Sequence, residues 1–255
     1  AWAGYTGVGG SEDPQAVLRA VSSLELIQAC ALLHDDIIDS SDTRRGRPTA
    51  HRTVETRHRE RGWSGDSAHF GRSVAILLGD FALAWADDLV HSSGLSAAAL
   101  RRVQEPWRAM RSEVIAGQLL DVSLEASGSE RLEDAERVNR FKTAAYTIER
   151  PLHIGAALAD APQPVVDAYR KFGADIGVAF QLRDDVLGVF GDPAVTGKPA
   201  GDDLREGKRT VLVASALALA DAHNPTAAEA LRRGIGTVKT PEEIAALTDI
   251  ISATG

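Results

Sequence analysis

The sequence is poor in cysteine, in strand-forming segments and in long hydrophobic runs. Cys30 is the one cysteine among 255 residues, which excludes an internal disulfide framework and fits a reducing, cytoplasmic compartment. The most apolar stretch, "VLVASALALA" at 211–220, is shorter than the roughly 18–20 residues that cross a bilayer. We therefore expect a protein without a membrane span and without disulfides.

Positive charge is also in deficit. Lys and Arg number 28 against 36 Asp and Glu, and the formal net charge is -8. Acidic surfaces disfavour nucleic acid and anionic membranes, so neither is an expected partner. The chain is long enough, and at 44% hydrophobic residues apolar enough, to bury one large core. We expect a single domain over residues 1–255, with residues missing upstream because "AWAGY" resembles the end of an element already under way.

Helical signals dominate what is present. Asp13 followed by Pro14 is typical of a helix start. Spacings of three and four then place one set of residues on a single helical face: Val17, Val21, Leu24, Gln28, Ala31 and Asp35. Further helices are expected over 71–91, 96–128, 131–159 with a kink at Pro151, 164–191 and 210–222. The stretches 59–71 and 191–210 are expected to be loops, and long loops in a compact helical domain tend to be functional.

The stretch "LLHDDIIDSSDTRRG" places carboxylates at the end of an apolar helix. Asp35 and Asp39 are four residues apart and share a helical face, with Asp36 nearby. Carboxylates at this spacing repel one another, and a hard divalent cation such as Mg²⁺ removes that cost. Two interpretations stay open at this point: a solvated acidic helix end, and a Mg²⁺ site.

A second acidic cluster favours the metal. Asp184 and Asp185 end another apolar helix, with Gln181 on the face of Asp184. Two such clusters facing each other across a cavity could hold several Mg²⁺ ions around one diphosphate. Basic side chains, the usual partners of a diphosphate, accompany both clusters, although a lone basic residue is more often a solvated one. They are Arg44, Arg45, Lys142 beside Thr143, Lys198 and Lys208.

These motifs resemble those of the trans-isoprenyl diphosphate synthases, the polyprenyl synthetase family. "LLHDDIIDSSDTRRG" is similar to its first aspartate-rich motif, and "FQLRDD" with "GKPAGDDLREGKRT" to its second. "GQLLD" and "FKTAAY" lie between them in the order of the family. The resemblance covers essentially the whole chain and implies an all-α orthogonal bundle around a deep central cavity, usually a homodimer. It further implies that a basic N-terminal segment and part of the C-terminus are absent.

The resemblance also implies roles for individual residues. Asp35 and Asp39 would be direct ligands among three Mg²⁺ ions, supported by Asp36, and Asp184 would hold the third ion with the aid of Asp185. Isopentenyl diphosphate would be bound by Arg45 and Gln28; Gln28 lies seven residues before Asp35 on the same helical face. The allylic diphosphate would be bound by Arg44, Lys142, Thr143, Gln181, Lys198 and Lys208. Of these, Lys142, Thr143, Gln181 and Lys198 would assist catalysis.

Two further side chains belong to a motif that the family shares, and one residue differs from the family pattern. Gln118 and Asp121 of "GQLLD" are expected to line the cavity or to orient a neighbour. Gly188 stands where many family members carry a closing aspartate, which implies reduced local charge and predicts only a modest effect of restoring an acid there.

The implied reaction is a head-to-tail condensation of isopentenyl diphosphate with an allylic diphosphate. Product length would depend on the residues one turn before Asp35. Cys30 and Ala31 are small there and would let the chain pass, and Trp85 on the facing helix could block it or belong to the core. We therefore expect C20 geranylgeranyl diphosphate, with C15 farnesyl or C25 products as alternatives. A class I terpene cyclase is a less favoured alternative, because the second cluster lacks an Asn/Ser/Glu-type metal motif.

Overall fold

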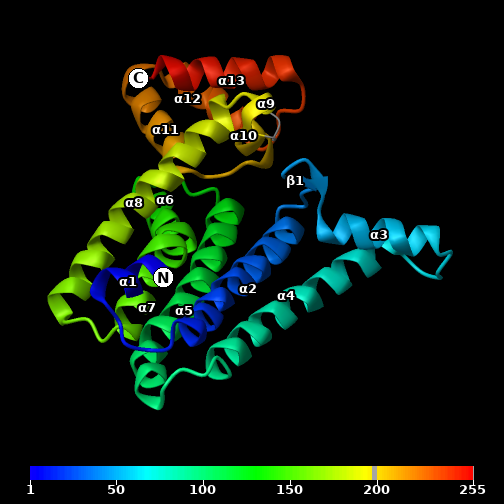
Figure 1. Ribbon diagram of the computed structural model, residues 1–255. Helices are drawn as coiled ribbons and strands as arrows, with labels where there is room; N and C mark the ends of the chain where they lie inside the picture. Colours follow the sequence, from blue (N-terminus) through cyan, green and yellow to red (C-terminus); the bar gives the residue numbers. More distant parts are fainter. Residues whose placement is uncertain (197–199, 255) are drawn as a thin grey trace. The chain divides into compact units, whose positions relative to one another are not determined.

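A computed structural model describes residues 1–196 and 200–254. The predicted all-α class is confirmed: apart from two strands of two residues each, the elements of the described chain are helices (Figure 1). The helices form two compact units, each built from two stretches of chain. The first unit contains residues 1–111 and 150–170, and the second contains 112–149 and the chain from 171 onward.

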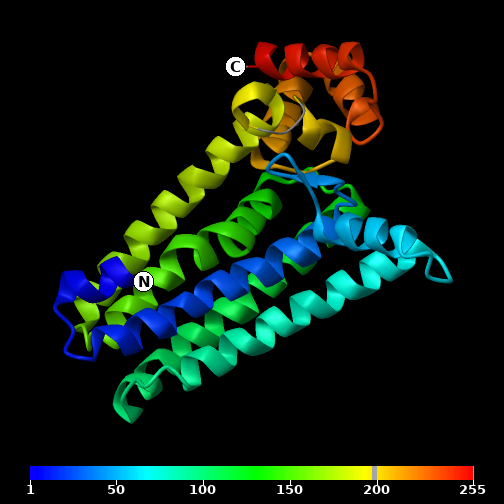
Figure 2. The same cartoon turned by 45° about the vertical axis from the view of Figure 1, so that its right-hand side comes forward.

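The first unit is built around two long helices. These are α2 (Pro14–Ile38) and α4 (Ser67–His91), which lie side by side (Figure 2). The buried face of α4 carries small side chains at helical spacing, among them Ala75, Gly79 and Ala82, and this lets α2 approach closely. The other elements are α1 (Trp2–Val8), β1 (Thr43–Arg44), β2 (Arg47–Pro48), α3 (Ala50–Glu60), α5 (Ala97–Ser127) as far as Arg111, α7 (Arg150–Leu158) and the start of α8 (Gln163–Phe190).

The predicted start of α2 is confirmed in detail. The Asp13 carboxylate accepts hydrogen bonds from the backbone N–H groups of Gln15 and Ala16, and Pro14 occupies the first helical position. This cap satisfies N–H groups that have no partner within the helix. The helix then runs without interruption to Asp39, its C-cap residue, so the first acidic cluster lies on its last turn.

Helix α2 is also long and apolar enough to cross a membrane, judged by length and composition alone. The prediction of no membrane span rested on the apolar stretch 211–220 and did not consider α2. A core helix passes the same test, and α2 packs along α4 and ends in three carboxylates.

The second unit has its core among its C-terminal helices. Leu204, Leu217 and Leu231 are fully buried there and belong to one apolar cluster together with Val189 of α8. The elements of this unit are the rest of α5, α6 (Leu132–Val138), the π-helix η1 (Asn139–Glu149), the rest of α8, α9 (Pro193–Thr196), α10 (Asp202–Glu206), α11 (Val211–His223), α12 (Pro225–Gly234) and α13 (Pro241–Ala253).

Three expectations about secondary structure were wrong. The 59–71 stretch is not one loop, because α3 extends to Glu60 and α4 begins at Ser67. The 191–210 stretch contains the short helices α9 and α10. The helix expected over 131–159 is α-helical only at its ends, and its central 11 residues form η1. A π-helix of this length cannot be inferred from apolar periodicity, because it depends on packing against neighbouring helices.

Candidate active site

The first acidic cluster divides into accessible and buried carboxylates. The Asp36 side chain is 6% exposed, whereas that of Asp35 is 21% exposed. Asp39 is half-buried, and its backbone N–H donates to the Asp35 carbonyl at 2.8 Å. Burial raises the pKa of Asp36, while the hydrogen bond from Arg44 lowers it. Asp35 and Asp39 are therefore the members of the cluster that a ligand can reach, and Asp36 is the supporting one.

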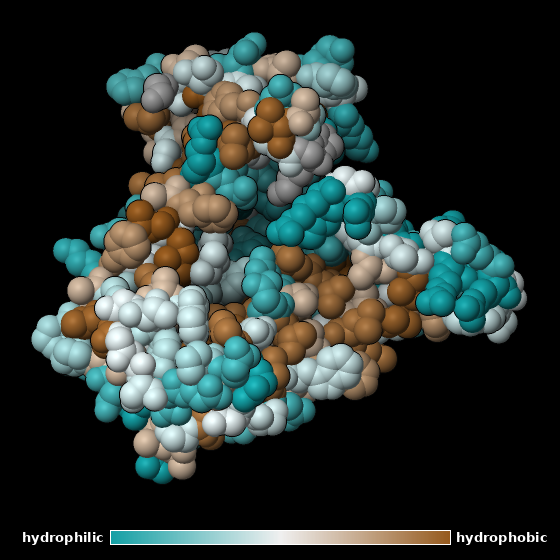
Figure 3. Space-filling model, in the orientation of Figure 1, coloured by the Kyte–Doolittle hydropathy of each residue, from teal (hydrophilic) through white to brown (hydrophobic). Residues whose placement is uncertain are grey.

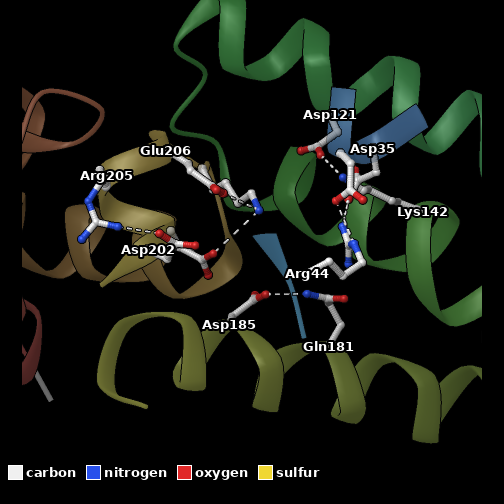
Figure 4. A network of polar contacts seen from close by, with 12 residues as sticks. Asp35, Arg44, Asp121, Lys142, Gln181, Asp185, Asp202, Arg205 and Glu206 are labelled. Carbon is white, nitrogen blue, oxygen red and sulfur yellow. Dashed lines mark hydrogen bonds and ion pairs between the residues drawn. The ribbon is translucent and has the colours of Figure 1, made fainter. Parts of the chain in front are cut away.

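Arg44 holds this cluster together. Its Nε donates to Asp36 Oδ1 at 2.8 Å, and its Nη2 lies 3.3 Å from Asp35 Oδ2 (Figure 4). One guanidinium thus contacts the carboxylates of two neighbouring residues, which offsets their repulsion. The sequence placed Arg44 next to the diphosphate; the structure adds that it is an ion-pair partner of the aspartates themselves.

A tight β-hairpin gives the neighbouring residues Arg44 and Arg45 different surroundings. β1 and β2 pair antiparallel with Arg44 opposite Arg47, so Arg45 and Gly46 form the two-residue loop. Both loop residues have positive φ, +52° at Arg45 and +71° at Gly46, as a type I′ turn requires. Gly46 adopts this conformation at no steric cost, whereas Arg45 does so under strain. The turn sends Arg44 to the acidic cluster and leaves Arg45 exposed.

His34 lies on the face of α2 that contacts α4. Its Nε2 lies 3.1 Å from the carbonyl oxygen of Ile76, and its Nδ1 lies 3.8 Å from Cys30 Sγ. A carbonyl only accepts hydrogen bonds, so Nε2 is the donor in its contact with Ile76. Burial raises the pKa of the Cys30 thiol, and the charge of Asp80 raises it further. His34 is thus a packed neighbour of the acidic cluster, as expected from the sequence.

The predicted chain-length residues differ in their surroundings. Cys30 is 9% exposed, whereas Ala31 is half-buried. Trp85 is 57% exposed and stacks on Phe81, with ring centroids 5.3 Å apart. The interpretation of Trp85 as ordinary core is therefore wrong. Its part in limiting product length stays a prediction.

The second acidic cluster, like the first, contains both an accessible and a buried carboxylate. Asp184 is exposed, and Asp185 is 2% exposed. Gln181 Nε2 donates to Asp185 Oδ1 at 2.8 Å (Figure 4). Burial raises the pKa of Asp185, while the hydrogen bond from Gln181 lowers it. Asp184 is therefore the accessible carboxylate of this cluster, and Asp185 is the buried one.

Lys142 and Thr143 lie in η1, which packs between two glycines of the same unit. A Cβ on Gly117 of α5 would come within 2.4 Å of the Lys142 backbone nitrogen, and one on Gly177 of α8 within 2.6 Å of Ala144 Cα. Lys142 Nζ donates to Asp121 Oδ2 at 2.5 Å (Figure 4). Asp121 therefore orients a neighbour, one of the two roles expected from the sequence.

The loop after α8 carries two of the predicted lysines. Lys198 lies outside the described residues. Lys208 Nζ lies 2.7 Å from Glu206 Oε2 and 3.9 Å from Asp203 Oδ1. Asp203 was not among the predicted site residues. Its motif "GDDL" lies in the sequence between Lys198 and Lys208, which are both predicted to bind the diphosphate.

The carboxylate oxygens of the two acidic clusters suit a Mg²⁺ ion that is also bound by a phosphate. Asp35, Asp39 and Asp184 offer accessible carboxylate oxygens, the ligands that Mg²⁺ prefers. Within residues 1–196 and 200–254, no three His, Cys, Asp or Glu side chains gather closely enough to hold a metal alone. Mg²⁺ commonly binds through one or two carboxylates and substrate phosphates, so the residues fit such an ion. Each cluster belongs to a different unit, and the predicted cavity between them stays a prediction.

Each acidic cluster lies near the end of a long helix and is accompanied by arginine, lysine or glutamine side chains, within an all-helical fold. Comparison with known proteins identifies the family. The sequence pattern of the family described as polyprenyl synthetase matches residues 2–251. The chain belongs to the polyprenyl synthetase family.

Relatives with known structures and curated relatives support the assignment. A geranylgeranyl pyrophosphate synthase from Corynebacterium glutamicum, solved with isoprenyl diphosphate and magnesium, is 61% identical with a TM-score of 0.97, covering 100% of this chain and 72% of that one. A (2E,6E)-farnesyl diphosphate synthase from Mycobacterium tuberculosis is 33% identical over 95% of this chain, which spans 63% of that protein's length. A geranylgeranyl diphosphate synthase from the same organism is 37% identical over 77% of this chain and 51% of its own length.

Proposed function

We propose that this chain is a Mg²⁺-dependent prenyltransferase that condenses isopentenyl diphosphate head-to-tail with an allylic diphosphate. The observation that carries the proposal is the arrangement at the end of α2. Two accessible carboxylates, Asp35 and Asp39, flank a buried one that Arg44 holds at 2.8 Å. This arrangement suits a metal-bridged diphosphate. The 61% identity to a synthase solved with isoprenyl diphosphate and magnesium supports the same substrate class.

Each group of residues has a distinct task in this reaction. The cations Arg44, Lys142 and Lys208 would stabilise the negative charge that builds on the departing diphosphate. Arg45 and Gln28 would hold isopentenyl diphosphate so that its double bond lies about 3–3.5 Å from the allylic carbon. Apolar walls would keep water from the carbocation. The released diphosphate would accept the proton that is lost, and no protein nucleophile is needed.

Three Mg²⁺ ions are proposed. Asp35 and Asp39 would share two of them, and Asp184 would hold the third. Mg²⁺ supplies charge neutralisation to the leaving diphosphate and orients it. The buried partners Asp36 and Asp185 would set the positions of these ligands.

The proposed product is C20 geranylgeranyl diphosphate. Cys30 and Ala31 lie one helical turn before Asp35. Their small side chains would let the growing prenyl chain extend past this turn of α2. Relatives of similar identity are named for different products, including farnesyl diphosphate at 33% and geranylfarnesyl diphosphate at 34% identity. C15 and C25 are therefore the alternatives that the product assay must separate.

A homodimer is proposed from the exposed face of α4. Leu77, Phe81 and Trp85 recur every four residues and are 57%, 54% and 57% exposed. Figure 3 shows apolar surface over the region where Figure 1 draws this helix. An apolar stripe of this kind is typical of a subunit interface. Phe81→Glu should turn a dimer into a monomer in light scattering, whereas Leu219→Glu, an exposed leucine of α11, should leave the dimer intact.

A cytoplasmic location is proposed on the single, buried thiol of Cys30.

The test of the whole function is incubation with Mg²⁺, labelled isopentenyl diphosphate and C5, C10 or C15 allylic diphosphates in turn. Chromatography should show a C20 prenyl diphosphate whose formation stops with a chelator. A cyclised hydrocarbon would instead identify a terpene cyclase, and no product from any primer would refute the proposal.

A further inference from the structure

The end of α8 contains an unusually close contact between a helix backbone and a side chain. A Cβ built on Gly188 would lie 1.9 Å from Asp203 Oδ2 and 2.4 Å from Asp203 Cγ. No real Cβ tolerates such distances, so the carboxylate of Asp203 occupies the space in which a side chain at position 188 would begin. A carboxylate from a different segment therefore lies beside Gly188, and the effect of this glycine on local charge stays a prediction.

Asp203 reaches this position because α10 is anchored on its other side. Leu204 is fully buried in the core of the second unit, and its carbonyl accepts from the Gly236 N–H at 2.8 Å. Neighbouring residues along a helical turn point in different directions. With Leu204 in the core, Asp203 is directed to α8, and its side chain is only 12% exposed.

The same carboxylate also contacts Lys208. Its Oδ1 lies 3.9 Å from Lys208 Nζ, and the Asp203 carbonyl accepts from the Lys208 N–H at 3.0 Å. Glu206 Oε2 holds the other side of the ammonium at 2.7 Å. One carboxylate thus connects the backbone of α8, one turn after Asp184, to a lysine predicted to bind the allylic diphosphate.

We propose that Gly188 is a positioning residue: by having no side chain it admits the Asp203 carboxylate, which sets the place of the Lys208 ammonium. This inference rests on the proposed function and deepens it. It assigns a role to a position that looked like a lost metal ligand. It also predicts that an acid introduced at position 188 displaces a carboxylate instead of adding one.

The first test is Gly188→Ala in the full chain. The added methyl is the smallest group that pushes Asp203 away. The allylic substrate's KM should rise about tenfold, the effect of one charged contact, with the KM of isopentenyl diphosphate nearly unchanged. Gly188→Asp should behave like Gly188→Ala or worse. Gly234→Ala is the matched control: a Cβ at this helical glycine would meet Leu247 Cδ1 at 2.7 Å, so it disturbs packing without touching Lys208.

A double-mutant cycle separates positioning from general damage. If Gly188 acts through Asp203, Gly188→Ala combined with Asp203→Ala should be no worse than Asp203→Ala alone. Multiplicative losses, or an unchanged allylic KM in a folded Gly188→Ala protein, would overturn the proposal. If Gly188→Ala does not fold, Asp203→Asn decides: it keeps the shape beside Gly188 but loses the charge facing Lys208, and an unchanged allylic KM would contradict the inference.

Calorimetric titration with inorganic diphosphate and Mg²⁺ gives a readout that does not depend on turnover. Affinity should fall in Gly188→Ala and Asp203→Asn and stay at the wild-type value in Gly234→Ala. If the wild-type chain forms no prenyl product, the proposed function fails, and this titration still tests Gly188. Equal affinities in all four proteins would refute the positioning role by itself.

Discussion

Arg44 Nε and Asp36 Oδ1 lie 2.8 Å apart, and the carboxylate in this pair is almost fully buried. Burial raises the pKa of Asp36, and the guanidinium counteracts that shift. A buried charge is retained when it is paired. The Arg44 side chain therefore has two tasks, one toward the fold at the end of α2 and one toward the proposed substrate.

Removal of an accessible carboxylate tests the metal site. Asp35→Ala or Asp39→Ala should lower turnover by several orders of magnitude, more than the ~10²–10³-fold that loss of one preorganised contact costs. Circular dichroism should show an intact fold. Asp42→Ala is the control, because Asp42 is an exposed residue whose side chain pairs with Arg52. Near wild-type turnover in either variant would contradict the metal-bridged diphosphate.

Replacement of Arg44 and replacement of Arg45 should raise the KM of different substrates and should change stability differently. Arg44→Ala should chiefly raise the allylic KM and should also lower the unfolding midpoint, because Asp36 is left buried without its cation. Arg45→Gly should chiefly raise the KM of isopentenyl diphosphate. It should preserve stability or increase it by about 1 kcal/mol, since glycine relieves the left-handed conformation at φ +52°. Equal effects of both variants on both Michaelis constants would refute the division.

Product length should respond to an aromatic residue one turn before Asp35. Ala31→Phe should shorten the main product by about one C5 unit, because the ring fills the volume of one isoprene unit. Cys30→Phe is a poorer probe: Cys30 is 9% exposed and contacts His34, so a large ring would overpack the α2–α4 interface. Ala29→Phe, on a different face of α2, is the control and should leave the product length unchanged. An unchanged product from an active Ala31→Phe enzyme would show that the chain grows elsewhere.

A hydrogen-bonded carboxylate in the first unit should make stability depend on pH. Glu12 accepts from the Ser96 hydroxyl at 2.5 Å and from its N–H at 3.0 Å, and these bonds hold the pKa of Glu12 below its ordinary value of 4.5. The stabilisation is therefore complete above the ordinary pKa and is lost as pH falls through the lowered one. Glu12→Gln should lower the unfolding midpoint by about 2–4 °C at pH 7, as for about 1 kcal/mol.

This difference should shrink as the pH falls below the ordinary pKa of Glu12. Thermal unfolding at a series of pH values checks it, and Glu60→Gln, at an exposed glutamate of α3, is the control. A constant difference at every pH would show that Glu12 acts through packing alone.

Features that depend on local chemistry could be predicted from the amino-acid sequence. Helical periodicity and the Asp13–Pro14 cap identified α2. The spacing of Asp35 and Asp39 fixed their shared helical face. These features follow from contacts between residues a few positions apart, which a sequence states directly.

Packing between distant segments determines which members of each acidic cluster are buried. The sequence presents Asp184 and Asp185 as equals, and packing against neighbouring elements exposes the first and buries the second. Likewise, Gly188 resembles a lost ligand in sequence, yet the fold brings Asp203, 15 positions later, to within contact of its backbone. Burial and close approach depend on which segments meet, and residues distant along the chain determine that.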